Sequence, residues 1–280
     1  MQTIAIIQAR MGSARLPGKV LLDIAGQPML ARVVERARRA KSLDGVAVAT
    51  TIDSADDPVA DFCAGRDYPC YRGSLHDVLD RYYQAARLFK ADFIVRLTAD
   101  CPLIDPGVID EVVRAFFGRA PTSDQPAASA SSPRFAANLQ IPAQVDFATN
   151  RLPPPWHRTY PIGLDTEVCT FQALERAWKE AVQPYHREHV MPYLYEQDGR
   201  FRIRLIHHDP DYGTLRWTVD TPQDLELVRQ VYARFAGRDD FTWQEVLALF
   251  EREPQLAQIN AAVRHKSFTD ADLSDGKPAE

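Results

Sequence analysis

Residues 3–19 read Thr-Ile-Ala-Ile-Ile-Gln-Ala-Arg-Met-Gly-Ser-Ala-Arg-Leu-Pro-Gly-Lys, and this stretch decides the fold class. The apolar run over 3–7 predicts a buried strand, and the loop after it carries three cations, Arg10, Arg15 and Lys19. Open α/β sheets bind their ligands in loops at the carboxyl ends of parallel strands. Small residues in such a loop let backbone N–H groups approach phosphate oxygens. The stretch therefore predicts an α/β fold with a polyphosphate-binding loop after its first strand.

The loop itself belongs to neither of the two common nucleotide-binding motifs. Gly12, Ser13 and Gly18 keep it open and Pro17 stiffens it, which favours ligand binding over three simply solvated cations. No Gly-x-Gly-x-x-Gly follows the strand, and the order Gly-x-x-x-x-Gly-Lys-Ser/Thr is absent. A different kind of nucleotide loop is required.

Strand and helix patterns alternate through the first part of the chain. Such alternation, with helical stretches of ten or more residues between strands, favours parallel pairing with right-handed crossovers. We therefore expect a doubly wound, mostly parallel, Rossmann-like sheet. The predicted strands span 3–7, 45–51 and 92–97, and the predicted helices span 28–41, 56–65 and 75–90.

The later part of the chain continues the alternation after a stretch without apolar periodicity. Thr242, three residues before Glu245, is the expected cap of the last helix. The predicted strands are 164–170, 201–207 and 215–219, and the predicted helices are 172–181, one from about 185, 222–235 and 241–251.

Composition restricts the class of protein. The chain has 280 residues, of which 45% are hydrophobic, enough to bury a large core. A net charge of −5 argues against a nucleic-acid partner. No stretch approaches the roughly 20 apolar residues of a membrane helix and no secretion signal is evident, so a cytoplasmic location is expected. The four cysteines lack Cys-x-x-Cys spacing, so a zinc site is not expected.

Two carboxylates follow predicted strands and are candidates for chemistry. Asp100 follows the strand over 92–97, and Asp220 follows the strand over 215–219. If both strands are parallel, the two side chains lie at the same sheet edge as the cationic loop. Each aspartate could instead cap a helix, and Asp220 precedes Thr221-Pro222, a good helix start.

Five phrases of this sequence resemble one enzyme family. The chain is similar to cytidylyltransferases that activate acidic sugars, of the acylneuraminate and 3-deoxy-manno-octulosonate type. Within them it most resembles the spore coat polysaccharide biosynthesis F-type proteins. The resemblance covers about residues 1–236, and its phrases are Arg10–Lys19, Arg96–Ile104, Tyr160–Glu167, Arg187–His189 and Arg216–Glu226.

The resemblance implies a reaction and its catalytic groups. A sugar hydroxyl would attack the α-phosphorus of CTP, pyrophosphate would leave, and a CMP-sugar would form. Arg15 and Lys19 would stabilise the pyrophosphate side and Arg10 the phosphates near the attacked phosphorus. The family's two Mg²⁺-binding aspartates correspond to Asp100 and Asp220, and two carboxylates with phosphate oxygens suffice for Mg²⁺.

The resemblance also implies two binding sets. Gly73-Ser74 can be read as a plain helix cap, and His189 as a residue at the edge of the core. The nucleotide set is Ala9, Arg10, Gly12, Ser13, Arg15, Lys19, Arg72, Gly73, Ser74, Asp77 and Thr98. The sugar set is Arg158, Tyr160, Asp165, Glu167, Arg187, Glu188 and His189.

The expected organisation has five parts. Residues 1–117 form the nucleotide-binding half, and 118–145 are an Ala/Ser/Pro-rich flexible insertion that departs from the family. That insertion is either a passive loop or a lid or partner contact. Residues 146–236 hold the sugar and dimerisation segment, 237–266 a C-terminal helix, and 267–280 a polar tail. Related enzymes form homodimers through this third part, and its large apolar side chains predict an exposed surplus and a dimer.

Three other functions stay open at this stage. A glycosyltransferase shares the fold class, although Asp100-Cys101-Pro102 replaces the Asp-x-Asp motif it would use. A sugar-1-phosphate uridylyl- or guanylyltransferase would begin its loop with a Gly-x-Gly run. A non-catalytic binding protein would have little reason to retain the cations and both aspartates.

Overall fold

The computed structural model describes residues 1–118, 145–151 and 158–264. The predicted insertion lies almost wholly outside these residues, and the polar tail lies entirely outside them. Within the described part of the chain, no helix is long and apolar enough to cross a membrane.

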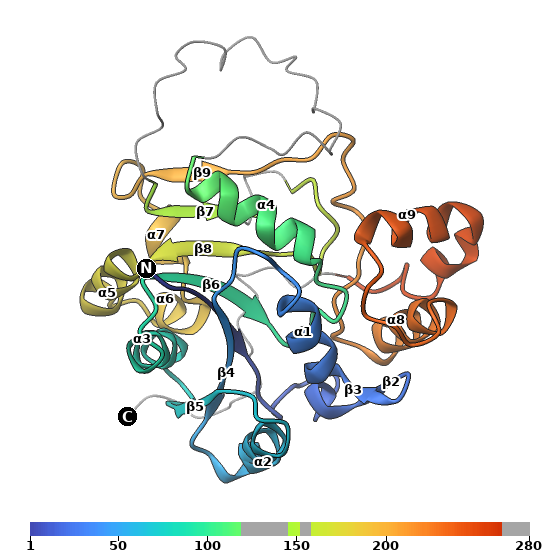
Figure 1. Ribbon diagram of the computed structural model, residues 1–280, viewed down its shortest axis with the longest axis horizontal. Coiled ribbons are helices and arrows are strands. Elements are labelled where there is room, and N and C mark those ends of the chain that lie inside the picture. The colour runs from blue at the N-terminus through green and yellow to red at the C-terminus, as the bar shows by residue number, and fades with distance from the viewer. Residues whose placement is uncertain (119–144, 152–157, 265–280) are drawn as a thin grey trace.

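A seven-stranded sheet in the order β5-β4-β1-β6-β8-β7-β9 forms the centre of the molecule (Figure 1). The strands β5, β4, β1 and β6 pair in parallel, so the predicted doubly wound sheet is confirmed. β8 pairs antiparallel with both β6 and β7, while β7 and β9 pair in parallel. The bounds are β1 Thr3–Gln8, β4 Gly45–Thr51, β5 Cys70–Gly73, β6 Phe93–Thr98, β7 Phe147–Thr149, β8 Glu167–Thr170 and β9 Ile203–Leu205. A separate hairpin pairs β2 Asp23–Ile24 with β3 Gln27–Pro28.

Helices cover both faces of the sheet, because the central strands are apolar on both sides. One buried cluster joins Ile7 and Val95 to helices α1, α2, α4, α8 and α9, and a second joins Ile6 and Ile94 to α3, α5 and α7. In Figure 1, α8 and α9 lie together at the far right of the view. The bounds are α1 Met29–Ala37, α2 Asp57–Gly65, α3 Val78–Leu88, α4 Pro106–Phe116, α5 Phe171–Glu180, α6 Pro184–His189, α7 Pro192–Tyr195, α8 Pro222–Arg234 and α9 Trp243–Arg252.

The predicted strand over 215–219 is wrong. This segment joins no sheet strand; its one bridge within the described residues pairs Arg216 with Ile162. The backbone N–H of Val219 donates instead to the carbonyl of Asp100 at 2.8 Å, in the loop after β6. The apolar pattern of the segment reflects burial among loops and helices rather than pairing within the sheet.

The apolar surplus from which a dimer was predicted is not exposed. Leu174 and Leu194 are fully buried in the chain's own core, and Tyr83 of α3 stacks on Trp178 with ring centroids 4.1 Å apart. Val190 and Tyr193 are also buried, and Phe171 packs against the same cluster. The argument from an exposed apolar surplus is therefore wrong, and the dimer stays a prediction that rests on the resemblance alone.

Candidate active site

The loop after β1 is fixed by backbone contacts that bring Lys19 to the edge of the sheet. The N–H of Ala9 donates to Ala49 O at 3.1 Å, and the N–H of Met11 donates to the Asp56 carboxylate at 2.5 Å. The N–H of Gly18 then returns to Met11 O at 2.9 Å, and Gly18 has φ +69°, which a glycine adopts without strain. A 3₁₀ helix at Lys19–Leu21 follows directly, so the loop ends at Lys19. The ammonium group of Lys19 contacts Asp100 and Asp220.

Asp100 lies immediately beyond the carboxyl end of β6, the parallel neighbour of β1. The Thr98 hydroxyl donates to its Oδ1 at 2.5 Å and orients the carboxylate. The following helix α4 is capped by Asp105, whose side chain accepts from Gly107 and Val108 N–H groups. Asp100 is therefore not a helix cap, and its carboxylate faces the loop.

Asp220 reaches the same place from a segment far away in the sequence. The Thr218 hydroxyl and the Val219 N–H both donate to Asp100 O, at 3.1 and 2.8 Å, which ties the two segments together. Helix α8 is capped by Thr221, which forms a reciprocal capping box with Asp224. The alternative reading of Asp220 as the helix cap is therefore wrong.

Lys19 joins the two aspartates. Its Nζ donates to Asp100 Oδ2 at 3.0 Å, to Asp220 Oδ1 at 2.8 Å and to Val219 O at 2.8 Å. Arg15 adds a fourth charge at 3.1 Å from Asp220 Oδ2. Burial opposes the charged form of Lys19, but the two carboxylates outweigh it and raise the lysine pKa. Burial likewise opposes the charged form of Asp220, and Lys19, Arg216 and Arg15 outweigh it and hold its pKa below the usual range.

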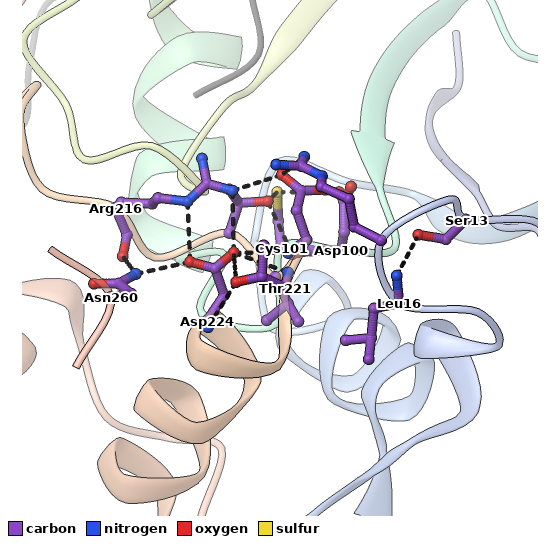
Figure 2. Close-up of polar contacts among 12 residues, drawn as sticks. Ser13, Leu16, Asp100, Cys101, Arg216, Thr221, Asp224 and Asn260 are labelled. Atoms are coloured by element: carbon purple, nitrogen blue, oxygen red, sulfur yellow. Dashed lines mark hydrogen bonds and ion pairs between the residues drawn. The ribbon is translucent and has the colours of Figure 1, made fainter. Parts of the chain in front are cut away.

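A second charged network holds Asp220 through Arg216. Arg216 donates to Asp220 Oδ2 at 2.7 Å and through Nε to Asp224 Oδ1 at 3.0 Å. Asn260 donates to the same Asp224 oxygen at 2.8 Å and to Arg216 O at 3.0 Å. Figure 2 shows Arg216, Asp224, Thr221 and Asn260 gathered beside Asp100. This network fixes the backbone that presents Asp220 to the loop.

The loop and the aspartates line one pocket of about 260 Å³. The pocket brings together eleven sequence-predicted residues with groups that the prediction did not include. The predicted residues that line it are Ala9, Arg10, Gly12, Ser13, Arg15, Lys19, Thr98, Asp100, Glu188, His189 and Asp220. Burial, the largest effect, lowers the pKa of His189.

The remaining nucleotide-set residues lie outside this lining. Arg72 donates to Thr51 O and forms an ion pair with Asp57 on the far side of β5. Asp77 caps α3 and pairs with Arg187, while Ser74 accepts from the Asp77 N–H at 3.0 Å. Because Asp77 is the cap of α3, the reading of Gly73-Ser74 as that cap is also wrong.

Five residues of the predicted sugar set likewise lie outside the lining. Tyr160 is 1% exposed and donates its hydroxyl to Glu111, so it offers no surface to a sugar. Arg158 and Asp165 form an ion pair at 2.8 Å. Glu167 is buried against Arg96, its partner residue across the β6–β8 pair, and Arg187 is occupied by Asp77.

Sequence reasoning missed three polar groups of the pocket: Gln8, Arg81 and Arg96. Arg96 lies two residues before Thr98 on β6, and strand alternation puts both on one face. Arg81 lies one helical turn after Asp77 on α3. These periodicities were available in the sequence, but the partner elements that turn both arginines towards the pocket were not.

The donor set of this site fits a magnesium ion. No group of three or more His, Cys, Asp or Glu side chains suited to a metal occurs in residues 1–118, 145–151 and 158–264. Two carboxylates, however, already share one cation, because Asp100 and Asp220 both contact Lys19 Nζ. Mg²⁺ is usually bound by one or two carboxylates together with substrate phosphates and water, so Asp100 and Asp220 are the residues that could hold such an ion.

A mostly parallel sheet with a cationic loop and paired aspartates at its carboxyl edge defines a nucleotidyltransferase. The profile of the cytidylyltransferase family matches residues 4–265, and the chain belongs to this family. It is a cytidylyltransferase.

Named relatives and a solved structure agree with this family. The spore coat polysaccharide biosynthesis protein SpsF of Bacillus subtilis is 32% identical over 261 residues, which cover 90% of this chain and 95% of that protein. The 3-deoxy-manno-octulosonate cytidylyltransferase of Anaeromyxobacter sp. (strain K) is 33% identical over 246 residues, covering 81% and 96%. A cytidylyltransferase structure from Leptospira borgpetersenii superposes with a TM-score of 0.79 at 30% identity, covering 95% of this chain and all of that one.

Proposed function

We propose that this cytidylyltransferase transfers CMP from CTP to an acidic sugar, with release of pyrophosphate, in the synthesis of a surface polysaccharide or glycan. The observation that carries the proposal is the bridge of Lys19 between Asp100 and Asp220 inside a pocket with Arg10 and Arg15. Relatives named for 3-deoxy-manno-octulosonate and for spore coat polysaccharide support an acidic sugar as the acceptor.

Positioning and charge stabilisation account for most of the catalysis in such a reaction, because the attacking hydroxyl comes from the substrate. The loop from Ala9 to Lys19 presents backbone N–H groups and cations to the triphosphate. Arg15 and Lys19 stabilise the charge that develops on pyrophosphate as it leaves. Arg10, exposed at the mouth of the loop, neutralises the phosphate under attack.

Asp100 and Asp220 would hold Mg²⁺, which when bound neutralises triphosphate charge and makes the sugar hydroxyl more acidic. Their orientation is set before substrate arrives. Thr98 fixes Asp100, and Arg216 fixes Asp220. Glu188 and His189 of α6 also line the pocket and would contact the sugar.

A pyrophosphate-release screen tests this proposal directly. Purified protein would be given Mg²⁺, each of CTP, UTP, ATP and GTP, and a panel of nonulosonic and related acidic sugars. We expect release with CTP and one acidic sugar, and far less with the other nucleotides. Equal turnover of CTP and UTP would contradict the preference for cytosine.

A glycosyltransferase and a non-catalytic binding protein would give different results in the same screen. A glycosyltransferase would be silent with every free sugar and would transfer sugar from a nucleotide sugar. A non-catalytic protein would bind CTP without releasing pyrophosphate from any pair. The Asp100→Asn variant measures the background of contaminating activity.

A further inference from the structure

Arg81 is a buried arginine without an ion pair. Its residue is 1% exposed, yet within the described residues it forms no salt bridge and one hydrogen bond, from NH1 to Ser74 O at 2.8 Å. Its Nε has no hydrogen-bond partner. A buried charge without a counter-charge is costly, so such a group usually has a partner of opposite sign.

The two carboxylates whose charges act on Arg81, Asp56 and Asp77, form no ion pair with it. Asp56 accepts from the Met11 N–H through Oδ1 and from the Thr51 hydroxyl through Oδ2. Asp77 accepts from the Asp80 N–H through Oδ1, while its Oδ2 pairs with Arg187. The charges of both carboxylates favour the charged form of Arg81, but their oxygens bond to other groups and neither forms an ion pair with it.

The chain makes room for Arg81 at the pocket wall. The stem of Arg81 lies against Gly73 of β5, where an added Cβ would come 3.2 Å from Arg81 Cγ and 2.8 Å from Tyr71. Arg81 and Arg10 both line the pocket. Burial lowers the pKa of Arg81, and the charge of Arg10 adds to this effect. Two cations that line one pocket and repel each other favour an anion close to both.

We propose that Arg81 and Arg10 form an oxyanion-binding subsite of the pocket, distinct from the Lys19 cluster, whose negative charge is supplied by the substrate. This inference rests on the proposed function for its two candidate sources. One is a phosphate oxygen of the nucleotide, and the other is the carboxylate of the acidic sugar. Both are oxyanions that a guanidinium binds with charge-assisted hydrogen bonds.

The test is calorimetric titration of the full chain, which needs no turnover. Inorganic pyrophosphate and 3-deoxy-manno-octulosonate serve as the two probes, each with Mg²⁺ present. Arg81→Met keeps the apolar stem and removes the charge, and we expect it to weaken binding of one probe about tenfold or more. Weaker pyrophosphate binding assigns the subsite to the nucleotide, and weaker sugar binding assigns it to the carboxylate.

Arg87→Met is the matched control, because Arg87 lies on the same helix and is exposed. We expect it to bind both probes as the unmodified protein does. Without ligand, Arg81→Met should melt at the same temperature as the unmodified protein or higher, since an unpaired buried charge is removed. A structural role for Arg81 would instead lower the melting temperature and leave both affinities unchanged.

If Arg81→Met does not fold, Arg81→Gln answers the same question, because it keeps a donor for Ser74 O without the charge. Unchanged affinity of the neutral variant for both probes would overturn the subsite, as would failure of the unmodified protein to bind either probe. Loss of probe binding in the variant, together with absence of CTP turnover in the unmodified protein, would retain the subsite and reject the proposed function.

Discussion

Asp220 and Asp224 lie four residues apart and both contact Arg216, yet their surroundings differ. The Asp220 side chain is 20% exposed and faces Lys19 and Arg15 in the pocket. The Asp224 side chain is fully buried and accepts from Arg216, Asn260 and the Thr221 N–H and hydroxyl. Asp220 keeps its negative charge where a substrate can reach it, whereas the charge of Asp224 is used within the fold. Under the proposed function, the same residue type serves chemistry at position 220 and stability at position 224.

The largest expected effect concerns the aspartates that face the pocket. Asp100→Asn and Asp220→Asn should each lower turnover about 100-fold or more, because each removes a metal-binding charge at the transition state. Melting temperatures should fall less than that of Asp224→Asn, since the amide has the same shape and the side chains of Asp100 and Asp220 are 28% and 20% exposed. Pyrophosphate release and thermal unfolding measure the two quantities. A variant that unfolds far earlier but keeps its turnover per folded molecule would make that aspartate structural.

Replacing the buried Asp224 should lower stability rather than turnover. Asp224→Asn leaves Arg216 buried with less counter-charge and breaks the capping box, so we expect a loss of about 3 kcal/mol in the free energy of unfolding. Urea denaturation followed by circular dichroism measures this loss. Glu226→Gln, on the same helix but exposed, is the control and should change stability little. An unfolding midpoint of Asp224→Asn equal to that of the control would refute the architectural role.

Acid should reveal the same difference. Burial opposes the charged form of Asp224, but Arg216 and Asn260 outweigh it and lower its folded-state pKa. A lowered carboxyl pKa gives stability that is present above the unfolded-state pKa, about 3.9, and is lost as pH falls towards the folded value. Below about pH 4, the unmodified protein should therefore lose stability more steeply than Asp224→Asn, by up to about 1.4 kcal/mol per pH unit. Parallel slopes in urea titrations at pH 3 to 5 would exclude Asp224 as the source.

The smallest effect separates two helix caps of identical design. Thr221 and Thr242 each begin a helix with a capping box, and replacing either by Ala should cost about 1 kcal/mol of stability. Thr221 also adjoins Asp220, so only Thr221→Ala should reduce turnover as well. Urea midpoints and kcat of both variants, compared below their unfolding transitions, provide the check. Equal turnover in the two variants would show that the cap of α8 does not position Asp220.

Regular elements with strong local patterns were predictable from the sequence. The apolar run of β1, the helices α1 and α3, and the Thr242–Glu245 capping box are all confirmed, because each depends on neighbours within a few residues. The short strands β5 and β7 were not predicted, since three or four residues carry little periodicity. The strand prediction for residues 215–219 was wrong because burial among loops gives the same apolar pattern as a strand.

The residues of the site also fall into a group that local sequence patterns predict and a group that they do not. The loop cations and Asp100 follow the ends of β1 and β6, and their meeting could be anticipated from parallel pairing. Asp220 follows a segment that joins no sheet strand, so its place beside Asp100 could not be derived in this way. The partners of Arg187 and Glu167 could not, because the ion pairs with Asp77 and Arg96 join elements distant in sequence. Such ion pairs make charged groups unavailable to a ligand, and no local sequence pattern predicts them.

The tie between the Asp100 carbonyl and the segment at Thr218 and Val219 has a consequence for the time at which activity appears during synthesis. A ribosome completes the parallel core, β5-β4-β1-β6, when it passes Thr98, whereas the second acidic group emerges far later. Until that late segment has closed onto the loop after β6, the nascent chain holds the cationic loop and Asp100 without Asp220. If the proposed function holds, a chain that ends between these points would bind nucleotide without transferring it, so activity would require synthesis past Asp220.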